Sequence, residues 1–171
     1  MPQSPTYVRS KAVDYANRWW NSANPAYPNM HVDCTNFVSQ CLYAGGLPMQ
    51  YNGARSAGWW MMPKRSGESW SYSWAVSHAL RIWLLQNRGP VRAVEVAQPS
   101  QLELGDLIFY DWDGDRRFTH TAIVTAFTEQ GEPLVHAHTV NRSFHHWAYQ
   151  DSYAFTRKTT YSFIHIAGVS T

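Results

Sequence analysis

The residue best suited to chemistry in this chain is Cys34, in the run Asp33–Gln40 (DCTNFVSQ). The preceding stretch, residues 24–33, contains two prolines and reads as a loop, whereas the residues after Cys34 have the apolar spacing of a helix. A cysteine at a helix N-terminus feels the positive end of the helix dipole, which favours the nucleophilic thiolate. We therefore expect Cys34 to be a nucleophile with a lowered pKa.

The second cysteine, Cys41, stands seven residues further along the same expected helix. Seven residues of helix rise about 10 Å, which is too far for a disulfide between the two. The pair also lacks the Cys-x-x-Cys spacing of structural zinc sites. We expect Cys41 to be a small buried apolar residue, which leaves Cys34 free for chemistry.

A nucleophilic thiol needs a base within hydrogen-bond reach, and the base needs a third group that orients it. Among the eight histidines, His120 follows a turn and begins a β-rich run, which places it at the end of a sheet. His136 and His138 are two apart on the next such run, so both point to one face. If the two strands form a hairpin, His120 comes close to that pair, and the Cys34 helix packs on the same face.

The elements that must position these residues are helices in the first half of the chain and strands in the second. This order predicts an α+β fold, with N-terminal helices packed on an antiparallel sheet. Residues 50–72 show little periodicity and are expected to form a long loop. The expected helices span 7–20, 34–43 and 73–87, and the expected strands span 107–110, 119–127, 134–140 and 161–169.

With 171 residues, the chain is expected to form a single domain, 1–171. A net charge of +2 and no Lys/Arg run argue against a nucleic-acid partner, but suit a mildly anionic polymer such as a cell wall. We expect no membrane-spanning segment, no signal peptide in residues 1–5, and a monomer. The aromatic share of 15% suggests either groove walls or core packing for Trp59, Trp60 and Trp74.

Taken together, the motifs resemble the putative amidase domain family, which is related to the NlpC/P60 and CHAP enzymes of the papain-like cysteine peptidases. The resemblance spans roughly residues 7–147, and its specificity comes from the order and spacing of a series of short motifs. These are residues 7–15, 33–40 with Gly45-Gly46, Ser73-Trp74, 105–108, 120–125 and 137–142.

This resemblance implies a papain-like, NlpC/P60-type core on which a helix-borne thiolate attacks an amide carbonyl. Cys34 would be the nucleophile, and His120 the general base and then the acid that protonates the leaving amine. For the third member the resemblance favours His138 first. Asn141 ranks second, since papain-like enzymes can orient the histidine with Asn, and His136 ranks third.

The same resemblance implies an oxyanion hole that includes the backbone N–H of Cys34 at the helix N-terminus. Asp33 is expected to cap this helix and to help shape the hole. Thr35 and Asn36 could orient neighbouring groups, or could equally serve as capping and packing residues.

The implied reaction is cysteine-dependent hydrolysis of an amide or peptide bond in bacterial peptidoglycan, without a cofactor or metal, by an exported or wall-associated protein. Deamidation, acyl transfer or toxin activity on a protein could use the same Cys–His site. A wall-binding module without activity is another alternative. A zinc hydrolase is the last, because His136 and His138 on one strand face could share a metal with His120 or Cys34.

Overall fold

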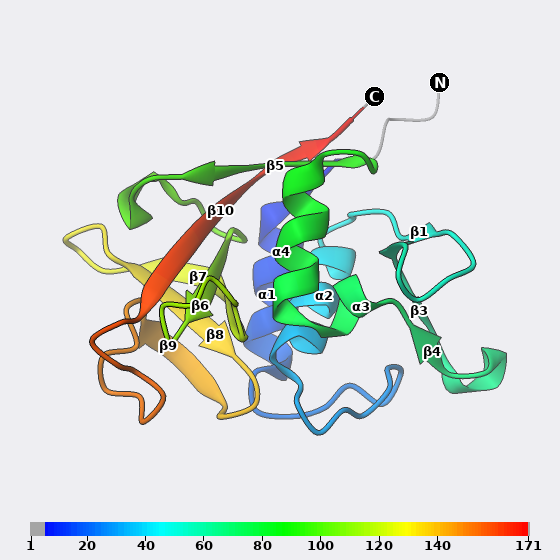
Figure 1. The fold of residues 1–171 in the computed structure, drawn as a ribbon, viewed down its shortest axis with the longest axis horizontal. Helices are drawn as coiled ribbons and strands as arrows, with labels where there is room; N and C mark the ends of the chain where they lie inside the picture. The colour runs from blue at the N-terminus through cyan, green and yellow to red at the C-terminus, as the bar shows by residue number, and fades with distance from the viewer. Residues whose placement is uncertain (1–5, 171) are drawn as a thin grey trace.

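The computed structural model describes residues 6–170 as a mixed fold of helices and antiparallel sheets (Figure 1). No helix among these residues is both long enough and apolar enough to cross a bilayer. The α-helices are α1 (Arg9–Trp19), α2 (Cys34–Ala44), α3 (Tyr72–Ala75) and α4 (Ser77–Gln86). The strands of the large sheet are β5 (Val91–Val96), β6 (Leu107–Asp111), β7 (His120–Phe127), β8 (Pro133–Ala137), β9 (Arg142–His146) and β10 (Thr160–Val169).

The large sheet has six strands in the order β5-β10-β6-β7-β8-β9, and each neighbouring pair is antiparallel. Figure 1 shows the four helices gathered between this sheet and the short strands near residues 50–70. The helices α1 and α2 pack against each other and against β7. The expected α+β class with an antiparallel sheet is therefore confirmed. The helix that begins with Cys34, α2, packs against β7, the strand that begins with His120.

Two apolar cores form on the two sides of the sheet, because side chains alternate along each strand. On the helix side, Ile123 of β7 packs with Phe37 and Val38 of α2. On the other side, Ala122 and Val124 pack with Tyr110, Tyr149 and their neighbours. The strand β7 is therefore buried on both faces, and the parity of a residue along it decides which core its side chain meets.

Several elements differ from the sequence expectation. The helix expected over 73–87 is divided at Val76, whose extended backbone (φ −118°, ψ 121°) separates α3 from α4. The expected loop over 50–72 contains the short strands β1 (Gln50–Tyr51), β2 (Gly58–Trp59), β3 (Met61–Met62) and β4 (Ser69–Trp70), and a 3₁₀ turn, η1 (Lys64–Ser66). A second 3₁₀ turn, η2 (Pro99–Gln101), precedes β6. The strand β8 ends at Ala137, before the expected 140, and a turn leads to β9, which was not predicted because its residues are mostly polar.

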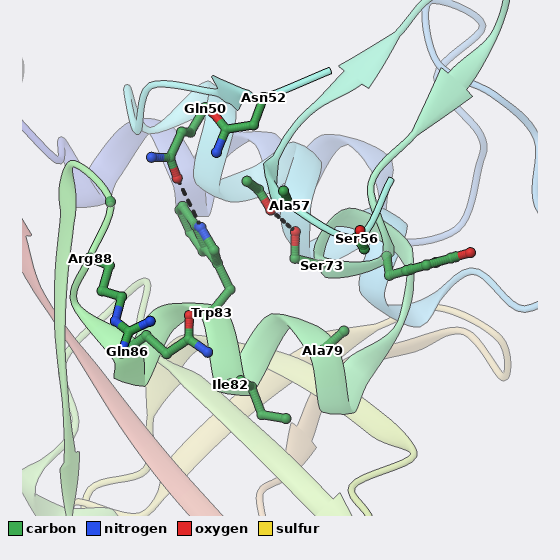
Figure 2. A pocket seen from close by; sticks show the side chains of 13 residues that line it. Gln50, Asn52, Ser56, Ala57, Ser73, Ala79, Ile82, Trp83, Gln86 and Arg88 are labelled. Carbon is green, nitrogen blue, oxygen red and sulfur yellow. Dashed lines mark hydrogen bonds between the residues drawn. The ribbon is translucent and has the colours of Figure 1, made fainter. Parts of the chain in front are cut away.

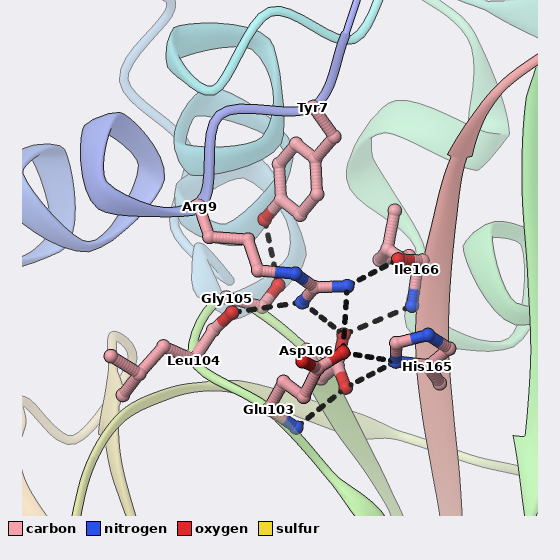
Figure 3. A network of polar contacts seen from close by, with 8 residues as sticks. All are labelled: Tyr7, Arg9, Glu103, Leu104, Gly105, Asp106, His165 and Ile166. Atoms are coloured by element: carbon pink, nitrogen blue, oxygen red, sulfur yellow. Dashed lines mark hydrogen bonds and ion pairs between the residues drawn. The ribbon is translucent and has the colours of Figure 1, made fainter.

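A buried acidic residue fastens the beginning of α1 to the sheet. Asp106, which directly precedes β6, is fully buried, and Figure 3 shows its carboxylate among groups from α1 and β10. It accepts hydrogen bonds from Arg9 (2.7 Å), from His165 Nδ1 (2.9 Å) and from the backbone N–H groups of Glu103 (2.8 Å) and Ile166 (3.0 Å). A buried carboxylate is tolerated only with such partners. The network thus fixes α1, and α2 packs against α1.

Candidate active site

Cys34 is the first residue of α2, and its side chain is 3% exposed. Its sulfur lies 3.7 Å from the hydroxyl of Thr35. Cys41 is fully buried on the same helix, and both cysteines are free, as the sequence predicted. Of the two cysteines, Cys34 is therefore the one that keeps some solvent-accessible surface.

Two pockets meet at Cys34. The small pocket, of about 130 Å³, and the large pocket, of about 690 Å³, share Val32, Cys34 and Thr119 as lining residues. The small pocket also contains aromatic and basic side chains, whereas the large one runs along the beginning of α4. The other residues of the small pocket include Trp112, His120, Thr139, Arg142, Tyr149 and Tyr153.

His120 lines the same small pocket as Cys34, so the fold brings the two predicted residues to one cavity. Its ring packs among Tyr110, Trp112 and Tyr149, with centroid separations of 5.3, 5.9 and 5.3 Å. Burial lowers the pKa of His120 to about 4, because the charged imidazolium loses its hydration there. The imidazole is therefore neutral at pH 7, which is the state that a general base needs.

The environment of the Cys34 thiol differs from the expectation of a lowered pKa. Burial raises the pKa of Cys34, because the thiolate loses hydration, and hydrogen bonds from Thr35, the Thr121 backbone and Thr139 oppose that rise only in part. Desolvation outweighs the helix N-terminus here. The resting thiol is therefore protonated, and a nucleophilic role would require that proton to leave.

Thr139, in the turn between β8 and β9, closes the N-terminus of α2. Its hydroxyl oxygen accepts hydrogen bonds from the backbone N–H groups of Asp33 and Cys34, each at 3.1 Å. Thr139 has φ +85°, a conformation that is costly for a β-branched residue and that clusters at functional sites. Asp33 makes no side-chain cap, which corrects the sequence expectation, and the backbone N–H of Cys34 is already bonded.

His138 lies against α1 and α2 instead of against His120. Its Nδ1 is 2.5 Å from the Asp33 carboxylate, its Nε2 is 2.7 Å from the carbonyl oxygen of Trp19, and its ring stacks on Phe37 at 3.9 Å. Both ring nitrogens are therefore engaged. The contacts of His138 hold Asp33, the residue that precedes the candidate nucleophile, and do not orient His120.

His136 is also engaged on the helix side. Its Nδ1 accepts the backbone N–H of Phe144 at 3.0 Å, so the proton is on Nε2, which donates to the Asn17 side chain at 2.9 Å. Asn141 is exposed in the β8–β9 turn. In the described part of the chain, no hydrogen bond joins His120 to His136, His138 or Asn141.

The strand register explains this separation. Ile123 of β7 pairs with His136 of β8, so His136 shares the helix-side face with Ile123, while His120, three residues earlier, has the opposite parity. A zinc site built from His120, His136 and His138 is therefore not formed. Within residues 6–170, the group of potential ligand atoms that does converge is Glu103, Asp106 and His165, which already serves the Arg9 network.

Asn36 and the predicted groove tryptophans belong to the core. Asn36 donates to the Asp33 carboxylate at 2.7 Å and accepts from the Trp74 indole at 2.9 Å. Trp59 and Trp74 are fully buried and Trp60 is 4% exposed, and none of them lines a pocket that contains Cys34. Core packing, the alternative weighed from the sequence, is their role, so the expectation of groove walls is corrected.

Another pocket, of about 430 Å³, lies on the far side of α4, between Trp83 and the β1–β2 segment (Figure 2). Figure 2 shows the Trp83 indole directed toward Gln50, to which it donates a hydrogen bond of 3.3 Å. None of its lining residues is a cysteine or a histidine. It shares Ala79 and Ile82 with the large pocket and thus adjoins the candidate site across α4.

Comparison with known proteins defines the class. Residues 6–164 match the family described as Putative amidase domain, and the chain belongs to that family. Membership points to a hydrolase of carbon–nitrogen bonds. No solved structure matches the chain, so the expected relation to the papain-like NlpC/P60 core is not confirmed.

Two curated relatives come from Bacillus subtilis (strain 168). The chain is 47% identical to "Uncharacterized protein YhbB" over 165 residues, which cover 96% of the chain and 52% of that protein. It is 28% identical to "Uncharacterized protein YjcM" over 144 residues, which cover 80% of the chain and 32% of that protein. The chain thus spans about half or less of the length of the relatives it matches.

Proposed function

We propose that this domain hydrolyses an amide bond in bacterial peptidoglycan, with Cys34 as the nucleophile and His120 as the general base and acid. The observation that carries the proposal is that a partly buried, neutral imidazole and the thiol line one small pocket. Family membership supports the class of bond. The wall substrate rests on the resemblance to wall-cleaving enzymes and on the net charge of +2.

In the acylation step, His120 takes the thiol proton while the Cys34 sulfur forms a bond to the amide carbonyl carbon. The tetrahedral intermediate collapses as the carbon–nitrogen bond breaks, and the imidazolium gives its proton to the leaving amine. A thioester remains on Cys34. His120 then deprotonates a water molecule that attacks the thioester, and the acid product leaves as the sulfur regains its proton.

Thr139 has a place in this scheme. Its hydroxyl oxygen accepts the same two N–H groups, those of Asp33 and Cys34, that would stabilise an oxyanion at a helix N-terminus. The hydroxyl thus occupies the position of the oxyanion, and the substrate carbonyl takes over these donors when the tetrahedral intermediate forms. Thr139 also opposes in part the rise that burial causes in the pKa of the Cys34 thiol, which favours the thiolate as it develops.

Asp33, Asn36 and His138 support the site by position. The Asp33 carboxylate is held from two sides, by Asn36 at 2.7 Å and by His138 at 2.5 Å. This fixes the residue whose backbone leads into Cys34. A nucleophile that is held in position reacts faster, because less orientational freedom has to be lost when the sulfur attacks.

The experiment is digestion of purified bacterial sacculi, followed by mass spectrometry of the released fragments. Wild type and the variants Cys34→Ala and Cys41→Ala are compared. Cys41→Ala is the matched control, because it removes the other cysteine from the same helix. New amine and carboxyl termini are expected with wild type and Cys41→Ala, and none with Cys34→Ala.

Two outcomes would contradict the proposal. Equal cleavage by wild type and Cys34→Ala would exclude a thiol mechanism. No new termini with wild type, alongside loss of ammonia or amine from protein amides in parallel assays, would move the substrate to the deamidase or acyl-transfer class.

A further inference from the structure

Three buried polar atoms near Cys34 have no partner. Within residues 6–170, the buried side-chain nitrogen and oxygen atoms without a hydrogen bond are His120 Nε2, Arg142 Nε and Tyr149 OH. All three side chains line the small pocket, which Cys34 also lines. A buried donor without an acceptor costs about 1–3 kcal/mol. Two of these groups, Arg142 Nε and Tyr149 OH, are donors beside one cavity, which indicates that a ligand with acceptor atoms belongs there.

Arg142 supplies a positive charge to this cavity. It begins β9, three residues after Thr139, and its guanidinium makes no hydrogen bond or ion pair within the described residues. The neighbouring carboxylate of Asp151 pairs instead with His145, at 3.0 Å. The hydrogen bond from His145 and, less strongly, the charge of Arg142 lower the pKa of Asp151, so Arg142 acts on that carboxylate through space. Its own hydrogen-bond donors are not used by Asp151 and are available to a ligand in the pocket.

Tyr149 supplies a neutral donor. Its side chain is 4% exposed, and its ring packs against Tyr110 and His120 at centroid separations of 4.9 and 5.3 Å. Burial raises the pKa of Tyr149, so the phenol keeps its proton. The hydroxyl can thus donate a hydrogen bond to an anion, and the packed ring holds it in place.

We propose that the small pocket binds a carboxylate which the substrate carries close to the scissile amide, with Arg142 and Tyr149 as the donors. A guanidinium binds a carboxylate through two parallel hydrogen bonds, and a single guanidinium matches the charge of a monoanion. The cavity of about 130 Å³ admits a short carboxylate-bearing group, and the larger part of the substrate lies in the large pocket. The proposal rests on the proposed function and adds a requirement for a free acid.

The test measures binding to the full chain carrying Cys34→Ala, so that the probes stay intact. The probes are N-acetylalanine, its neutral amide N-acetylalaninamide, and inorganic phosphate, titrated by calorimetry or by amide NMR shifts. In this background, Arg142→Gln removes the guanidinium and Tyr149→Phe removes only the hydroxyl. Arg117→Gln is the matched control, because it removes an equal charge from the large pocket.

We expect the acid to bind about tenfold or more tightly than the amide, a difference of about 1.4 kcal/mol. Arg142→Gln should abolish this preference and Tyr149→Phe should reduce it, while Arg117→Gln leaves it within about twofold. Equal binding of acid and amide would overturn the proposal, as would tighter binding of phosphate or an equal loss with Arg117→Gln. If Arg142→Gln fails to fold, the difference in affinity between the acid and the amide, measured on the chain that carries only Cys34→Ala, still tests the proposal.

This test is independent of turnover. A missing preference for the acid would remove the carboxylate pocket and leave amide hydrolysis by Cys34 standing. The sacculus digestion with Cys34→Ala decides the hydrolysis itself.

Discussion

The hydroxyl oxygen of Thr139 lies 3.1 Å from the backbone nitrogen of Cys34, although 105 residues separate the two in sequence. The turn between β8 and β9 is therefore built onto the N-terminus of α2. The same turn leads to Arg142, which lines the small pocket. One short segment thus contacts the candidate nucleophile and shapes the cavity beside it.

Replacement of Thr139 should reveal this contact. Thr139→Val keeps the shape but leaves the N–H groups of Asp33 and Cys34 without their acceptor, so we expect a loss of stability of about 1–2 kcal/mol. The rate of amide cleavage should fall about tenfold, because Thr139 opposes in part the burial that raises the pKa of the Cys34 thiol. Thr139→Ser keeps the hydroxyl and should retain most of both. Equal effects of Val and Ser, measured by thermal unfolding and cleavage rate, would contradict the assignment.

The acid side of the pH profile should report His120. Because burial lowers the pKa of His120 to about 4, the base is neutral and active above that pH and protonated below it. The value of kcat/KM should therefore fall as the pH drops through about 4, and not near 6.5, the usual value for histidine. A fall centred near 6.5 would show that the ring is hydrated in the working enzyme.

His138→Gln distinguishes positioning from catalysis. Because His138 contacts the Asp33 carboxylate, its replacement should lower both the stability and the cleavage rate. The pH at which kcat/KM falls on the acid side should stay unchanged, because His138 does not contact His120. If His138 were the third catalytic member, the limb would shift together with the rate. The pH profile of the variant separates the two roles.

The aromatic residues offer a paired comparison. Trp74→Phe removes the indole hydrogen bond to Asn36 (2.9 Å), so we expect a loss of about 1–3 kcal/mol in stability with little change in KM at a permissive temperature. Tyr153 lines the small pocket and is 88% exposed, so Tyr153→Ala should leave stability unchanged and raise KM. A raised KM with unchanged stability for Trp74→Phe would instead support Trp74 as a wall of the substrate groove.

The sequence predicts local features of this fold well, and long-range ones less well. The beginning of α2 at Cys34 follows from the loop before it and the apolar spacing after it, and His120 at the start of β7 follows from the preceding turn. Burial of Cys41 follows from the helical period alone. These properties depend on residues close in sequence.

The remaining features depend on strand register. Whether His136 faces His120 is decided by the pairing of Ile123 with His136, and a shift of one residue would reverse it. The contact of Thr139 with Cys34 and the position of Tyr149 likewise come from tertiary packing. Thr139 falls within the motif 137–142, but nothing in that motif indicates its contact with Cys34, and Tyr149 lies outside every motif.

The central claim is that His120 draws the proton from Cys34, and alkylation measures this without any substrate. Iodoacetamide is applied at pH 7, and the modified residue is identified by peptide mass spectrometry in wild type and in His120→Ala, each checked for folding. We predict modification of Cys34 and not of the fully buried Cys41, at a rate at least about tenfold lower in His120→Ala. Equal rates of Cys34 modification in the two proteins would contradict the account.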